Sequence, residues 1–510
     1  MAGKNIVIVT RELVPFYYGG IGTQFKALAR LLIGEGHWIT ILSPKPDDFD
    51  EAVFQEHYPD VALHFVDCDR VSIAPDYSPT GGLISTFQYT YSLAVAQAFD
   101  NLILSIPVDF VVCADFGAEA FFLLKKKTAG FYKAVRFVLF IEGSLFDTLT
   151  VYQGKDEGKF QSELLDPQNR LNCALEDACI LMADDLIVPT EITWQQTKER
   201  LNLTRSAEII ANIADSQLFD PSLDHGADTC DNRISLFVGR LDRHKGADIL
   251  LSAFIEMYGD RPDDAPELLF VGRNTFNKQY QTTFIDYWQD RIPQVLASRI
   301  VFLGQVPHND VINYFKKATV SIFPSRWEVF GIVCLEAMSY GCPVIVTRGT
   351  GLEEVIGPDL NTFAVDFQTQ QEKLAALFET FFHNSEWDAG PLRKQVQARA
   401  SSLVEEAQYR FKEFFLQDSV AESSKQFVDF KQVAAVQDKV SVALVDILNI
   451  LSNDFLRFSD WSGLNEQEMK QVLTSDSRQS MEREQEQDQD QENETLASVL
   501  LKQIKTAFGR

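Results

Sequence analysis

Twice along its length, this chain of 510 residues alternates short apolar runs with glycine-containing loops and amphipathic stretches. Near the start, the apolar run 5–10 (NIVIVT) leads into a loop, a helical pattern over 23–34 and a second apolar run at 38–42. Short apolar runs suit buried parallel strands, and parallel strands need a crossover segment, which is usually a helix. The opening therefore predicts a β-α-β unit in a parallel sheet covered by helices.

The pattern ends and then begins again. After further apolar runs at 108–112, 135–141 and 185–189 and a short one ending at Asn212, it restarts with ISLFV at 234–238. Four more short runs follow, at 268–271, 300–303, 320–323 and 343–346. Two consecutive doubly wound domains fit this better than one oversized sheet. We therefore predict an α/β protein with Rossmann-like domains at 1–215 and 216–400.

The rest of the chain has a different character. We expect a helical extension over 401–474, part of which could pack back on the first domain. Residues 475–494 are rich in Glu, Asp and Gln, and we expect a disordered linker there because so little apolar surface can be buried. Residues 495–510 fit an amphipathic helix that either docks on the body or binds a protein partner.

Charge and composition exclude several classes of protein. Lys and Arg total 46 against 73 Asp and Glu, a net charge of −27, which argues against binding to nucleic acid or to an anionic membrane surface. We find no run of about 18 apolar residues that would span a membrane, and the start lacks the apolar stretch of a signal peptide. The seven cysteines are scattered without a C-x-x-C pair, so we expect a reduced, cytoplasmic protein without a zinc site.

The most informative segment reads FPSRWEVFGIVCLEAMSYGCPVIV. It predicts a strand, a loop that carries Glu328, and a helix that begins near Phe330 and Gly331 and contains Glu336. The backbone N–H groups of Phe330, Gly331 and Ile332 would form a seat for a phosphate at the helix N-terminus. The two carboxylates could accept hydrogen bonds from vicinal hydroxyl groups of a ribose or a sugar. The alternative is two solvated glutamates beside an ordinary helix.

This segment, with E-x-F-G-x-x-x-x-E-A-M followed by G-x-P-V-I, resembles the E-x7-E signature of retaining glycosyltransferases of the GT-B type, family 4. Glycogen synthase and sucrose-phosphate synthase are relatives in that family. The resemblance is continuous over about 210–357 and patchier over 1–200. It implies a GT-B fold and the retaining, metal-independent transfer of a hexose from a nucleoside-diphosphate sugar. The acceptor hydroxyl would belong to a sugar, glycan, lipid or protein.

The resemblance also implies roles for individual residues. Glu336 would hold the ribose of the donor, Glu328 would contact hydroxyls of the transferred hexose, and the backbone at 330–332 would face the sugar and the distal phosphate. In the segment LFVGRLDRHKG, Arg240 and Lys245 would grip the diphosphate after Gly239. Two cations stabilise the charge that a diphosphate leaving group acquires, so no cofactor or metal is expected. Without the resemblance, both would be read as surface charges.

Two further segments are similar to the family. The first loop (ELVPFYYGGIG) resembles an E-x-x-P…G-G-x-G loop whose glycines, here Gly19 and Gly20, would face the donor phosphates. Backbone near Val306 would lie against the base. The loop is not G-x-G-x-x-G, which disfavours a dinucleotide cofactor.

One departure from the family stands out. Family members carry a histidine at the end of a strand of the first domain, and this chain has Glu142 there (RFVLFIEGS). Glu142 could replace the histidine as a hydrogen-bonding group in catalysis, change the choice of donor, or mark lost activity. Two rival functions stay open: a non-catalytic sugar-nucleotide-binding or scaffold protein, which Glu142 and the acidic tail would support, and a nucleotide-sugar epimerase, a different enzyme class on the same architecture.

Overall fold

The computed structural model describes residues 3–17, 19–67, 87–152, 167–213, 233–277, 281–386 and 388–417. The chain divides into two units, Met1–Ile447 and Leu448–Arg510, and all described residues belong to the first. The acidic linker predicted at 475–494 and the helix predicted at 495–510 lie outside the described residues.

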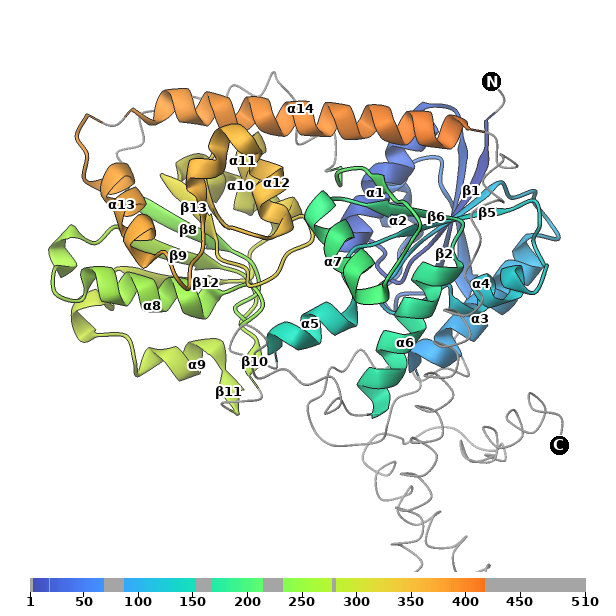
Figure 1. Ribbon diagram of the computed structural model, residues 1–510, viewed down its shortest axis with the longest axis horizontal. Coiled ribbons are helices and arrows are strands. Elements are labelled where there is room, and N and C mark those ends of the chain that lie inside the picture. The colour runs from blue at the N-terminus through green and yellow to red at the C-terminus, as the bar shows by residue number, and fades with distance from the viewer. Residues whose placement is uncertain are drawn as a thin grey trace, which may run out of the picture. The chain divides into compact units, whose positions relative to one another are not determined.

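The first sheet has seven parallel strands in the order β3-β2-β1-β4-β5-β6-β7. In Figure 1 this sheet and its helices are coloured from blue to green. They are β1 (Asn5–Val9), β2 (Trp38–Pro44), β3 (Ala62–Val66), β4 (Phe110–Ala114), β5 (Arg136–Phe140), β6 (Asp185–Val188) and β7 (Glu208–Ile209). The strand β3 is absent from the sequence-based prediction. It is an edge strand with a half-buried pattern, so it lacks the continuous apolar run that marks the central strands.

The second sheet has six parallel strands in the order β12-β9-β8-β13-β14-β15. They are β8 (Ile234–Val238), β9 (Glu267–Val271), β12 (Ile300–Gly304), β13 (Val320–Phe323), β14 (Val344–Thr347) and β15 (Ala364–Val365). A two-stranded antiparallel ribbon of β10 (Phe276–Asn277) and β11 (Thr282–Thr283) follows β9. Both sheets share the doubly wound order, so the predicted fold class is confirmed.

Helices connect these strands. Those of the first domain are α1 (Gly20–Gly34), α2 (Glu51–His57), α3 (Phe87–Leu102), α4 (Phe121–Thr128), α5 (Leu145–Tyr152), α6 (Pro167–Met182) and α7 (Glu191–Leu201). After β8 follow α8 (Ala247–Tyr258), α9 (Phe284–Gln289), α10 (His308–Lys317), α11 (Ile332–Ser339), α12 (Gly351–Ile356), α13 (Gln371–Phe382) and α14 (Ala389–Leu416). In the doubly wound order, ligands bind beyond the carboxyl ends of the strands where the order reverses. That point lies between β1 and β4 in one sheet and between β8 and β13 in the other.

The long helix α14 buries side chains in the cores of both sheets. Its amino-terminal part, as far as Val404, contributes Leu392, Val396, Ala400 and Val404 to the core around the second sheet. Its second half packs on the first sheet, where the ring of Phe411 stacks on Phe140 at 5.8 Å. The helix begins at Ala389, twelve residues before the boundary expected at 401. Pro391 lies in its first turn, where proline is tolerated, and Asp388 caps it by accepting a hydrogen bond from the N–H of Gly390.

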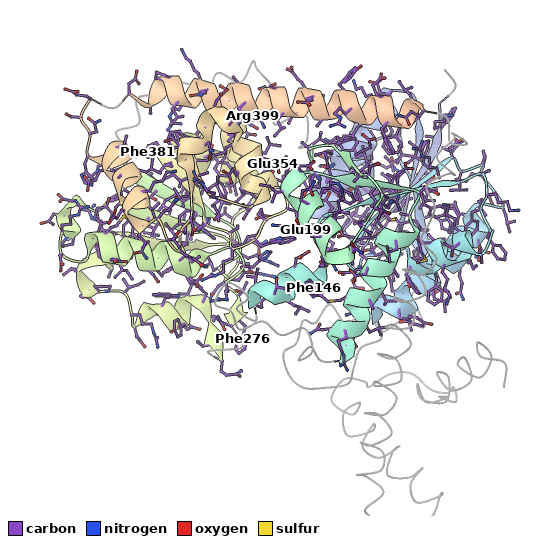
Figure 2. The ribbon with its side chains drawn as sticks, viewed as in Figure 1. Phe146, Glu199, Phe276, Glu354, Phe381 and Arg399 are labelled. Atoms are coloured by element: carbon purple, nitrogen blue, oxygen red, sulfur yellow. The ribbon has the colours of Figure 1, made fainter. Side chains whose placement is uncertain are left out.

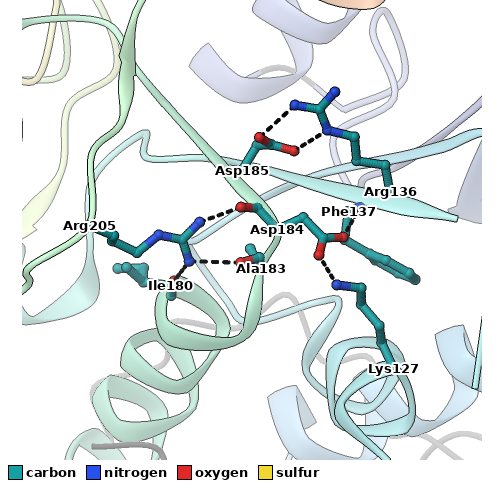
Figure 3. A network of polar contacts seen from close by, with 8 residues as sticks. All are labelled: Lys127, Arg136, Phe137, Ile180, Ala183, Asp184, Asp185 and Arg205. Atoms are coloured by element: carbon teal, nitrogen blue, oxygen red, sulfur yellow. Dashed lines mark hydrogen bonds and ion pairs between the residues drawn. The ribbon is translucent and has the colours of Figure 1, made fainter. Parts of the chain in front are cut away.

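A network of charged side chains joins β5 and β6 at their amino ends (Figure 3). The guanidinium group of Arg136 donates to both carboxylate oxygens of Asp185, at 2.5 and 2.8 Å. Lys127 pairs with Asp184, whose other oxygen accepts from the N–H of Phe137. These contacts hold the strands at the end of the sheet that is opposite to the predicted ligand side.

Candidate functional site

The loop between β8 and α8 is packed tightly on its neighbours through glycines. A Cβ atom on Gly246 would lie 1.9 Å from the carbonyl oxygen of Pro324, just after β13, and φ of Gly246 is +72°. A Cβ atom on Gly272, which follows β9, would lie 1.9 Å from the carbonyl oxygen of Gly239. Only glycine allows these backbones to approach so closely. The loop that carries Arg240 and Lys245 is therefore held against the loop that carries Glu328.

This packing brings Lys245 and Glu328 together. The ammonium group of Lys245 donates to Oε2 of Glu328 at 2.6 Å, and the hydroxyl group of Ser325 donates to the same oxygen at 3.2 Å. Burial alone would raise the pKa of Glu328. The charges of Lys245 and His244 and the two hydrogen bonds outweigh that effect, so this pKa lies below its usual value. Glu328 is therefore ionised at neutral pH and can accept hydrogen bonds from hydroxyl groups.

Arg240 has a different partner. Its Nε lies 3.0 Å from Oδ2 of Asp242, and its side chain is 45% exposed. The same Asp242 accepts from the backbone N–H of Lys245 at 2.8 Å, so it orders the turn that carries both cations. The two predicted phosphate-binding cations thus share one loop, and Arg240 stays accessible at its surface.

The helix α11 begins as the sequence predicts. Gly331 is its N-cap residue, with φ of +87°, and a Cβ atom there would lie 2.3 Å from the side chain of Leu352. Phe330 is buried, and Ile332 is the first helical residue. The first N–H groups of a helix have no acceptor within the helix, so they are available to an anion. They lie directly beside the loop that carries Glu328.

Glu336 is buried in α11, which contradicts the interpretation as a solvated glutamate. It is 4% exposed, and this burial raises its pKa to about 8. Nε2 of His308, the first residue of α10, lies 3.7 Å from Oε1 of Glu336. The half-buried Val306 lies two residues before His308. The segment expected near the base and the glutamate expected near the ribose therefore lie close together.

Glu142 follows β5 at the carboxyl end of the first sheet. Its Oε2 accepts a hydrogen bond from the side-chain amide of Asn212 at 2.8 Å, and its backbone N–H donates to Asp115 at 2.9 Å. Burial raises the pKa of Glu142 to about 8, with further raising by the charges of Asp115 and Glu12 against a lowering by Asn212. Oε1 of Glu142 and Oδ1 of Asn212 are buried without a hydrogen-bond partner among the described residues.

The residue after Glu142 touches the loop that carries Glu328. Gly143 has φ of +118°, and a Cβ atom on it would lie 2.7 Å from the ring of Trp327 and 2.9 Å from the side chain of Val329. Trp327 also stacks on His244, with ring centroids 5.9 Å apart. Reasoning from the sequence missed Trp327, although a large aromatic residue directly before Glu328 was a usable signal. The structure therefore brings the segments of Glu142 and Glu328 together.

Gly19 and Gly20 lie at the start of α1. Gly19 is the extended N-cap residue, and a Cβ atom on it would collide with the carboxylate group of Glu12 at 2.1 Å. Gly20 is the first helical residue, so α1 begins three residues before the predicted start at Thr23. Among the described residues, no hydrogen bond or ion pair joins either glycine to Lys245 or Glu328. Their contact with a donor stays a prediction.

Comparison with known proteins agrees with this geometry. Residues 227–402 match the family model described as glycosyl transferases group 1. The matched region contains all six strands of the second sheet. Arg240, Lys245, Val306, Glu328 and Glu336 all lie inside the matched region, whereas Glu142, Gly19 and Gly20 lie outside it.

Curated relatives match this chain over part of their length. The D-inositol 3-phosphate glycosyltransferase of Corynebacterium urealyticum is 26% identical over 221 residues, which are 42% of this chain and 51% of the relative. The mannosylfructose-phosphate synthase of Agrobacterium fabrum is 27% identical over 174 residues, 34% of this chain and 37% of the relative. The chain thus spans between one third and one half of these relatives.

Solved structures match over both sheets. Sucrose-phosphate synthase from Thermosynechococcus elongatus has a TM-score of 0.61 at 21% identity, covering 81% of this chain and 98% of that protein. The catalytic domain of starch synthase IV from Arabidopsis thaliana has a TM-score of 0.57 at 15% identity, covering 82% and 100%. These likenesses show the fold: the chain has the predicted GT-B architecture.

Two features are absent from the described part of the chain. Among those residues, no group of three or more His, Cys, Asp or Glu side chains could hold a metal ion. No described helix combines the length and apolar character that crossing a membrane requires.

Proposed function

We propose that this protein is a retaining glycosyltransferase that moves a hexose from a nucleoside-diphosphate sugar to an acceptor hydroxyl, without a metal. The observation that carries the proposal is the pair formed by Lys245 and Glu328 beside the N-terminus of α11 in a glycosyl transferases group 1 domain. A cation, an ionised carboxylate and free backbone N–H groups are the groups that a diphosphate and a sugar require.

Each predicted residue has a task in this proposal. Lys245, Arg240 and the α11 N-terminus oppose the negative charge that develops on the leaving diphosphate. Glu328 accepts hydrogen bonds from hexose hydroxyls, and Glu336 accepts them from the ribose. The acceptor proton passes to the leaving diphosphate on the face where the acceptor attacks. In support, solved neighbours include HepE of Anabaena in complex with UDP-glucose and starch synthase IV bound to ADP.

Glu142 is proposed to serve the reaction from the first domain. Its free Oε1 lies in a buried polar cluster with Asn212 and Asp115, and its segment packs on the loop of Glu328 through Gly143. A carboxyl group with a pKa of about 8 is largely protonated at neutral pH, so it can donate as well as accept a hydrogen bond. We propose that it contacts the hexose or the acceptor in place of the family histidine.

The test is turnover of a donor. Purified protein is incubated with a panel of UDP-, GDP- and ADP-sugars, and released nucleoside diphosphate is measured with and without sugar acceptors. We expect slow release from one donor without acceptor, faster release with the right acceptor, and a product that keeps the anomeric configuration by NMR. Binding without release under every acceptor would support the non-catalytic alternative, for which the replacement by Glu142 is the specific observation. Donor isomerisation without release would support an epimerase.

A further inference from the structure

The first turn of α7, in the first domain, hydrogen-bonds the backbone of the loop that carries Glu328. The hydroxyl group of Thr190 donates to the carbonyl oxygen of Val329 at 2.9 Å, and that of Thr193 donates to the same oxygen at 3.3 Å. Both threonines are buried. Because Val329 directly follows Glu328, these contacts act on the peptide that carries the proposed sugar-binding carboxylate.

A side chain of the second domain caps the same helix. The carboxylate group of Glu354, on α12, accepts hydrogen bonds from the backbone N–H groups of Glu191 at 2.9 Å and Ile192 at 2.6 Å. These are the first two residues of α7, whose N–H groups have no acceptor within the helix. A carboxylate at this end also interacts favourably with the helix dipole. The clasp therefore consists of Thr190 and Thr193 on one domain and Val329 and Glu354 on the other.

The second domain holds its half of the clasp rigidly. The guanidinium group of Arg399, on α14, donates to the carbonyl oxygens of Glu354 at 2.8 Å and Val355 at 3.1 Å. Figure 2 labels Glu354 on α12 and Arg399 on α14. The N–H of Gly351 donates to the carbonyl oxygen of Glu328 at 2.8 Å. A Cβ atom on Gly351 would lie 1.8 Å from the carbonyl oxygen of Val329. The peptide from Glu328 to Val329 is thus held by both domains.

We propose that Thr190 and Glu354 are positioning residues for the transfer reaction: they orient the Glu328 loop toward the donor by fixing Val329 against α7. This inference rests on the proposed function. The nucleotide is proposed to bind mainly to the second domain. Loss of the clasp should therefore leave nucleotide binding intact and lower turnover, because misplacement of catalytic groups acts on the reaction step.

The experiment compares Thr190→Val, which removes the hydroxyl group at nearly constant volume, with Thr190→Ser, which keeps it. The donor identified in the panel is used for turnover, and the matching nucleoside diphosphate is titrated for its Kd. We expect Thr190→Val to lower turnover by about tenfold, the effect of losing the hydrogen bond to the carbonyl oxygen of Val329, with the Kd within about twofold of wild type. Thr190→Ser should keep turnover within about twofold. Glu354→Ala should behave as Thr190→Val does, and Glu199→Ala, at an exposed position of α7 outside the clasp, serves as the matched control.

Hydrogen exchange gives a readout that needs no activity. In Glu354→Ala the amides of Glu191 and Ile192 should exchange faster, and in Thr190→Val the amides of residues 327–331 should do so. Unchanged exchange in both variants would overturn the inference. Wild-type turnover in Thr190→Val would also overturn the inference. A Kd that weakens as much as turnover falls would overturn it too, because the clasp would then have a purely structural role. Wild-type protein that turns over no donor would refute the proposed function, and with it the link to catalysis.

Discussion

The ammonium group of Lys245 lies 2.6 Å from a carboxylate oxygen of Glu328, although 83 positions separate the two residues in the chain. One residue belongs to the loop after β8 and the other to the loop after β13, the two neighbouring strands at which the order of the second sheet reverses. The pair therefore connects Lys245, which is proposed to bind the diphosphate, with Glu328, which is proposed to bind the sugar. It also keeps the pKa of Glu328 low despite burial.

Replacing Lys245 by Ala should reduce donor turnover by about 100-fold or more while the protein stays folded, because a cation that opposes the leaving charge is lost. Glu328 would also lose its main partner, which should raise its pKa. Nucleoside diphosphate release measures the first effect, and circular dichroism with thermal unfolding checks the fold. Lys394→Ala, an exposed residue of α14, is the matched control and should leave both unchanged. Unchanged turnover in Lys245→Ala would refute the phosphate assignment.

Glu336 should make stability depend on pH. Its pKa rises to about 8 in the folded protein from an ordinary value near 4.5 in the unfolded chain. Its contribution is therefore fully present below about pH 4.5 and is lost as pH rises through about 8. Compared with Glu336→Gln, the wild type should lose a few kcal/mol of unfolding free energy between pH 5 and pH 8, in urea titrations at several pH values. Parallel pH curves for the two proteins would contradict the buried, protonated state.

The ionisation of Glu142 should determine how turnover falls at alkaline pH. Its pKa of about 8 predicts that the protonated form, which can donate a hydrogen bond, dominates at neutral pH and disappears as pH rises through 8. Wild-type turnover should therefore fall above about pH 8, and Glu142→Gln, which keeps a donor and an acceptor, should lack that inflection. The measurement is the pH profile of kcat/KM for both proteins, which reports groups of the free enzyme. The same inflection in Glu142→Gln would assign it to another group.

Gly143 should tolerate no side chain. Alanine there would have to adopt φ of +118° and place its Cβ atom 2.7 Å from the ring of Trp327. We expect Gly143→Ala to lose about 1–3 kcal/mol of stability from strain and overpacking, and to lower turnover by separating the Glu142 and Glu328 segments. Gly34→Ala is the control, since a Cβ atom there meets nothing within 4 Å. Equal stability of the two variants would show that the loop relaxes freely.

Asp185→Ala should destabilise the first sheet. It removes the bidentate partner of Arg136, which is 6% exposed and would be left as an unpaired buried charge. We expect a loss of about 3–5 kcal/mol in unfolding free energy. Glu208→Ala, which breaks the more exposed pair with Arg410, should cost at most about 1 kcal/mol. Equal losses in the two variants would argue against the buried pair.

The amino-acid sequence by itself determined the two parallel sheets, because buried parallel strands have continuous apolar sequences such as residues 234–238. It also placed Gly331 at the start of α11, since the backbone there requires positive φ. Local patterns like these need only neighbouring residues. It could not reveal edge strand β3, whose half-buried pattern is weak, or the start of α14, whose Gly390 and Pro391 resemble a break.

Only the tertiary structure decided which distant groups meet. The pairs of Lys245 with Glu328, Asn212 with Glu142 and Thr190 with Val329 join residues 70 to 139 positions apart. Such contacts depend on strand order and on the close approach of loops through glycines, and neither is encoded in local periodicity. Burial, and with it the raised pKa values of Glu142 and Glu336, is likewise a property of the packed molecule, because desolvation comes from neighbours that only folding supplies.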